Sequence, residues 1–188
     1  MKKRFSIVLL SGLLLSCSEG EKQPLANPTQ IDKYFPLKDF VEEQINSLDG
    51  QKVGKLSLIN GDEQTSEVIL DKDAWRKELD IFIQSDINKA ANSSSYETIE
   101  KDGKLTHRLK EGAKGSIKLI EISYAEGSDR VSSIYFESEE DNMFYESSAE
   151  GVLEMNETGA LEQYEVSGFQ KVWFLEPNKI KVQGEVID

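Results

Sequence analysis

Few side chains in this sequence are reactive enough to carry chemistry. The 188 residues include one cysteine, Cys17, one histidine, His107, and 35 Asp and Glu residues. A lone thiol can be a nucleophile or a site of covalent modification, and a lone histidine can be a general base. Zinc sites built from His and Cys are excluded, because they take three or four such ligands.

His107 has no identifiable catalytic partner in the sequence. It alternates with Leu105 and Leu109, so it shares their face of a predicted strand. No Gly-x-Ser-x-Gly, His-Glu-x-x-His, P-loop or dinucleotide-binding motif occurs. We therefore interpret His107 as a structural histidine, and we predict a protein that is not an enzyme and has no cofactor.

The densest acidic cluster is interpreted as a solvated turn. It comprises residues 137–141 with Glu146 on the following strand, and its spacing lacks the Asp-x-Asp-x-Asp-Gly pattern of a calcium loop. Runs of like charge usually mark exposed loops. The sequence therefore predicts no metal site.

The residues before Cys17 give its thiol a specific chemical role. Three basic residues at positions 2–4 precede an apolar stretch, 5–15, that is shorter than the roughly 20 residues of a membrane span. The segment Leu14-Leu15-Ser16-Cys17 resembles the lipobox of bacterial lipoprotein signal peptides. The resemblance implies that residues 1–16 are removed and that Cys17 becomes a thioether to diacylglycerol, which anchors the chain outside the cytoplasm.

Residues 17–33 are expected to be a lipidated tether, and the outer membrane is the expected location. The tether is polar and contains Pro24 and Pro28. Ser18 stands where enteric lipoproteins kept in the inner membrane have aspartate, and residues 18–21 resemble the acidic surface signal of Bacteroidetes-type lipoproteins. Periplasmic and surface-exposed locations both stay open.

The charge of the mature chain restricts its partners. Residues 1–16 hold three of the 22 Lys and Arg residues, so 19 basic residues then face 35 acidic ones, a net charge of −16. Such a balance argues against nucleic acid as a partner. The expected partners are the membrane, through the lipid on Cys17, and either a protein or a hydrophobic ligand.

Residues 34–188 are predicted to form one α+β domain. Apolar periodicity predicts a helix over 35–48, a hairpin over 52–59 and 64–70 around Asn60-Gly61, and a second helix from Asp71 to about Asn88. Short strands separated by turn signals, including Glu150-Gly151 and Ser167-Gly168, are then expected over residues 96–100, 105–110, 116–124, 130–137, 142–148, 152–156, 160–166, 170–175 and 179–187. The predicted architecture is an N-terminal helix–hairpin–helix followed by a curved antiparallel β-meander.

Two predicted strands, 116–124 and 170–175, are apolar on both faces and need cover on both. Two helices can cover one face, which leaves the other for curling of the sheet, a partner or a ligand. The candidate ligand or partner face comprises aromatic residues of the helix and the late strands. These residues are Trp75, Tyr164, Trp173 and Phe174.

The layout resembles uncharacterised small lipoproteins of the Bacteroidetes type. Beyond the lipobox, the resemblance covers residues 35–40, 75–79 and 85–89 and the late meander, and it implies no activity. In architecture alone, helices on a curved antiparallel sheet are similar to the periplasmic lipoprotein carriers, which does not set function.

Three functions follow from these observations, each with its own geometry. A non-enzymatic outer-membrane lipoprotein that binds a partner or serves envelope assembly requires an exposed patch on a filled core. The alternative, a carrier or sensor of a hydrophobic ligand, requires an aromatic pocket between helices and sheet. A hydrolase of envelope sugars requires two carboxylates that face each other in a cleft. We favour the first.

Overall fold

The computed structural model describes residues 29–187. Cys17, the predicted signal peptide and most of the predicted tether lie outside them. The helices are α1 (Leu37–Ser47), α2 (Lys72–Glu78), α3 (Asp80–Gln84) and the 3-10 turn η1 (Ala90–Asn92). The strands are β1 (Lys52–Ile59), β2 (Asp62–Ile69), β3 (Tyr96–Lys101), β4 (Lys104–Leu109), β5 (Ile117–Tyr124), β6 (Val131–Asn142), β7 (Tyr145–Met155), β8 (Leu161–Val172) and β9 (Asn178–Ile187).

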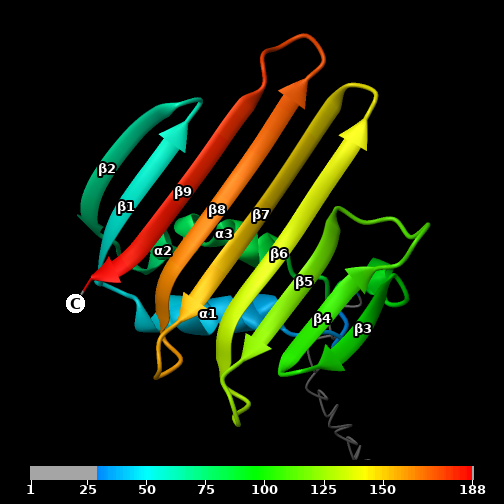
Figure 1. Ribbon diagram of the computed structural model, residues 1–188, viewed down its shortest axis with the longest axis horizontal. Helices are drawn as coiled ribbons and strands as arrows, with labels where there is room; N and C mark the ends of the chain where they lie inside the picture. Colours follow the sequence, from blue (N-terminus) through cyan, green and yellow to red (C-terminus); the bar gives the residue numbers. More distant parts are fainter. Residues whose placement is uncertain (1–28, 188) are drawn as a thin grey trace, which may run out of the picture.

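All nine strands join one antiparallel sheet, in the order β2-β1-β9-β8-β7-β6-β5-β4-β3. Strands β3 to β9 follow one another as a meander, and β1 then pairs with β9. The predicted α+β class and antiparallel sheet are confirmed, and the sheet is open, with β2 and β3 at its edges. Helices α1 to α3 lie against one face and cross only part of the strands' length, as Figure 1 shows.

Helix α1 forms where its apolar stripe predicts it and is capped from a distant segment. Leu37, Val41 and Ile45 are fully buried on one side of the helix. Pro36, the N-cap residue that precedes the helix, offers no side-chain cap. The carboxylate of Asp86 supplies it instead, because Oδ2 accepts a hydrogen bond from the Lys38 N–H at 2.9 Å.

The predicted second helix is shorter than expected and is divided in two. Asp71 caps α2, accepting from the Ala74 N–H at 2.8 Å, but Leu79 leaves helical geometry and α3 ends at Gln84. Residues 85–88 do not continue the helix, because the Asn88 side chain makes four hydrogen bonds to the backbone of residues 33–35 instead. The predicted N-terminal helix–hairpin–helix is therefore not confirmed as a unit, and its hairpin belongs to the main sheet.

Two predicted turns are wrong, because their glycines lie inside long strands. Gly151 is in the middle of β7, and Gly168 is in β8. A Cβ atom on Gly151 would lie 2.4 Å from the Phe136 ring and 2.9 Å from the Phe82 ring. Gly151 is therefore needed for close packing between sheet and helix rather than for a turn, and segments 142–148 and 152–156 merge into one strand.

The core lies between the helices and the sheet. Trp75 of α2 packs edge-on against Tyr164 of β8, with ring centroids 6.3 Å apart. Phe82 of α3 packs in the same way on Phe136 of β6, at 5.3 Å. Ile122 of β5 is also fully buried. Aromatic rings and branched aliphatic side chains thus fill the space where a carrier would need a ligand cavity.

Candidate functional site

The four aromatic residues of the candidate face do not come together. Trp75 and Tyr164 are buried in the core, whereas Trp173 and Phe174 lie in the loop between β8 and β9, 72% and 67% exposed. The predicted strand over 170–175 is wrong at its end, because β8 stops at Val172 and the chain turns back. The candidate face is thus divided between an internal cluster and an exposed loop.

The internal cluster continues into a small polar network. The Tyr164 hydroxyl donates to Glu78 Oε1 at 2.6 Å, and the Lys55 ammonium group donates to Glu78 Oε2 at the same distance. Burial and the neighbouring Glu78 carboxylate raise the pKa of the Tyr164 hydroxyl above its usual value. The network joins α2 to β1 and β8 and leaves both Glu78 oxygens satisfied, so we assign it a structural role.

His107 is held by hydrogen bonds that fix its tautomer. Its Nε2 accepts from the Phe35 N–H at 3.1 Å, so Nδ1 carries the proton and donates to Thr98 Oγ1 at 2.9 Å. The side chain is 2% exposed, and burial lowers its pKa to about 4. Both ring nitrogens are occupied by structural bonds.

The face of the sheet turned away from the helices, which we call the open face, is polar. Side chains alternate along β7, so that Leu153 and Gly151 face the helices while Glu146, Ser148 and Glu150 face outward and are exposed. No described element covers this face (Figure 1).

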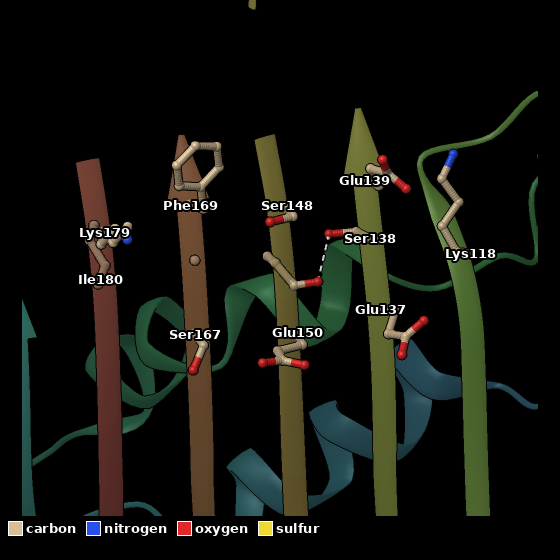
Figure 2. Close-up of a pocket in the computed structure, with 12 residues that line it drawn as sticks. Lys118, Glu137, Ser138, Glu139, Ser148, Glu150, Ser167, Phe169, Lys179 and Ile180 are labelled. Atoms are coloured by element: carbon tan, nitrogen blue, oxygen red, sulfur yellow. Dashed lines mark hydrogen bonds between the residues drawn. The ribbon is translucent and has the colours of Figure 1, made fainter. Parts of the chain in front are cut away.

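A shallow hollow of about 490 Å³ crosses the open face over β5 to β9. It lies between two rows of outward side chains that run across the strands. Within each row, the strand register pairs each residue with the next one on the neighbouring strand. One row holds Glu137, Glu150 and Ser167, and the other holds Glu139, Ser148, Phe169 and Lys179. Figure 2 shows these residues on the strands, with the helices behind the sheet and Lys118 at one end of the hollow.

Two carboxylates in this hollow lie close to the same hydroxyl. The Tyr135 hydroxyl is 2.8 Å from Glu137 Oε1 and 3.2 Å from Glu150 Oε2. Partial burial and these carboxylates raise the pKa of Tyr135, so the hydroxyl stays protonated and acts as a hydrogen-bond donor to them. The carboxylates stand side by side on neighbouring strands of an open surface, and a hydrolase needs them across a cleft.

The sheet extends beyond the helix layer at one end, where apolar side chains are exposed. Hairpins β6–β7 and β8–β9 reach furthest there (Figure 1). We call the five large exposed side chains of these two hairpin ends the apolar tip, and they are 57–84% exposed. They are Met143, Phe144, Trp173, Phe174 and Leu175.

The sequence predicted two of the five residues of the apolar tip, Trp173 and Phe174, as part of a binding face, and it did not predict the hollow. The run 173–175 has three apolar residues in succession, which is also the pattern of a buried strand, and Glu176-Pro177 beyond it was the only turn signal. The hollow depends on which strands are neighbours and on their register. Alternation along single strands predicts that the residues of the hollow share one face of the sheet, but it does not predict which of them are neighbours across the strands.

The described part of the chain contains no helix long and apolar enough to span a membrane and no cluster of His, Cys, Asp and Glu suited to a metal ion. Comparisons with protein-family models, with curated proteins and with solved structures found no match to this chain.

Proposed function

We propose that this chain is a membrane-anchored, non-enzymatic lipoprotein of the outer membrane whose open face binds a protein partner of the cell envelope. The observation that carries the proposal is the one-sided sheet. Helices and core occupy one face, and the other carries a hollow bordered by polar side chains. The anchor is the lipid expected on Cys17.

The filled core supports a binding module over a carrier. Trp75 and Tyr164, two of the four aromatic residues of the predicted ligand or partner face, pack against each other instead. Phe82 and Phe136 close the neighbouring space, and a side chain as small as a methyl group on Gly151 would collide with them. The alternative function, a carrier or sensor of a hydrophobic ligand, would require the helices to move away from the sheet.

The chemistry of the hollow indicates the kind of surface that would fit it. Glu137, Glu139 and Glu150 provide acceptors, Lys118 and Lys179 are the two cations, and Phe169 offers an apolar contact. Outside the hollow, Glu165 is already paired, because the Lys181 ammonium group lies 2.8 Å from it and lowers its pKa. We therefore expect a polar partner segment that brings basic groups and one apolar side chain.

Site-specific photo-crosslinking in the native envelope tests this proposal. A photoreactive residue replaces Ser148 or Ser167 in the hollow, and a third variant carries it at Gln84, an exposed position of α3 on the other side of the sheet. We expect the same protein to be captured from both hollow positions and not from position 84.

A second variant keeps this experiment specific to the hollow. Phe169→Asp removes the apolar contact while leaving the core untouched, and we expect it to lower the crosslinking yield roughly tenfold, as loss of a central interface residue does. Equal capture from position 84, or a yield that Phe169→Asp leaves unchanged, would contradict the proposed surface.

A further inference from the structure

The apolar tip is a built feature rather than a frayed loop end. The Trp173 N–H donates to the Phe144 carbonyl at 3.1 Å, which ties the two hairpin ends together, and the Trp173 and Phe174 rings pack edge-on with centroids 5.8 Å apart. Asn60 of the β1–β2 turn fixes the start of β9, accepting from the Lys179 N–H at 2.8 Å. The tip is therefore held in place while its side chains stay exposed.

We propose that the apolar tip inserts into the interfacial region of the bilayer that holds the lipid anchor, as a second point of attachment made by the protein itself. This inference rests on the proposed anchor at Cys17. Trp, Phe, Leu and Met are the side chains that partition into the headgroup and acyl boundary, and neither 143–144 nor 173–175 contains a charge.

The length of chain between Cys17 and the folded part permits both attachments at once. The Tyr34 ring contacts His107, with centroids 5.4 Å apart, and the register places His107 level with Ile120 and Phe136. From Phe136 to the end of β6 at Asn142 is six residues, about 20 Å at the rise of a strand. Thr29 lies twelve positions after Cys17, and a chain of that length spans up to about 40 Å.

The charges near the tip select the kind of lipid. Asp141, Glu146 and Glu176 flank it, against Lys171 and Lys179, within a mature chain of net charge −16. An anionic surface would repel such a protein, so the matching surface is a zwitterionic one. With the tip inserted, the strands stand upright on the membrane and the open face is turned sideways, free to meet a partner.

Tryptophan fluorescence of the full lipidated chain in vesicles tests the insertion, because the two tryptophans differ in exposure. Trp173 is exposed, whereas Trp75 is fully buried. In phosphatidylcholine vesicles that contain brominated lipid, we expect quenching of the Trp173 emission and a shift of that emission to shorter wavelength. Trp173→Phe should abolish both changes and leave the Trp75 signal alone.

Tip variants and a matched control separate insertion from a general effect of charge. Phe174→Asp combined with Met143→Asp should reduce the quenching roughly tenfold or more, since two apolar side chains lose their burial. Ile69→Asp changes a side chain as exposed as Trp173 at the opposite end of the sheet, and it should have no effect. Replacing phosphatidylcholine by phosphatidylglycerol should weaken the quenching.

Other outcomes overturn the inference and can be told apart from failure of the anchor. Trp173 emission that stays unquenched in vesicles would overturn it. So would a Trp173 shift that depends on protein concentration without lipid, which would show contact between two copies. The mass of the same sample reports whether Cys17 is acylated, so a chain without lipid would count against the anchor. In that case the unacylated chain would be tested at high lipid concentration.

Discussion

At the scale of single residues, His107 shows how the two ring nitrogens of a histidine can hold neighbouring segments together. The histidine belongs to β4 and joins the segment that leads into α1 to the edge strand β3. It accepts the Phe35 N–H and donates to Thr98, so its neutral form is required. The sequence indicated this role, because no partner for catalysis could be assigned to the residue.

The neutral state of His107 predicts an acid-sensitive stability. Its pKa is about 4 in the folded protein and about 6.5 in an unfolded chain, so the unfolded state binds more protons between these values. The free energy of unfolding should therefore fall as the pH drops below 6.5, by about 2 kcal/mol between pH 7 and pH 5. Urea unfolding at the two pH values measures this.

His107→Gln is the matched variant for that measurement, because an amide can still accept one hydrogen bond without gaining a proton. We expect it to be less stable at pH 7 and to lose most of the pH dependence. A variant that kept the full slope between pH 7 and pH 5 would show that other groups cause it.

At the scale of elements, local patterns located most helices and strands but misjudged where they end. Periodicity predicted α1, and the cap on α2 was readable from Asp71. The end of α3 was not readable, because it depends on Asn88 binding a segment 55 residues earlier in the chain. Gly151 in β7 was equally ambiguous, because a glycine between two apolar segments can mark either a turn or a close contact inside a strand. Only the neighbouring rings of Phe82 and Phe136 show that it permits close packing.

The role of Gly151 gives a prediction about β7 and the helix layer. Gly151→Ala would place a methyl group within 2.4–2.9 Å of two core rings, so we expect a loss of about 1–3 kcal/mol in the free energy of unfolding. Gly168→Ala in the adjacent strand is the control, because its Cβ would meet only the Ser148 carbonyl at 4.0 Å. Denaturant unfolding of both variants makes the comparison, and equal stabilities would contradict the packing role.

At the scale of the whole molecule, the fold presents three different surfaces. Helices and core occupy one face of the sheet, the open face carries the hollow, and the apolar tip lies at the end beyond the helices (Figure 1). The sequence predicted the α+β class, the meander and helices on one face of the sheet, but not the hollow or the gathering of apolar side chains at the tip. The hollow and the tip follow from strand order and from the short helix layer, which are properties of the assembled sheet.

Native mass spectrometry of the chain extracted from its own membrane tests the binding-module function most directly. We predict a mass that begins at Cys17 and includes covalent acyl groups, with no further small molecule bound, because the core between helices and sheet is filled. A non-covalent mass of lipid size, bound one to one and released on activation, would contradict this function and favour the carrier.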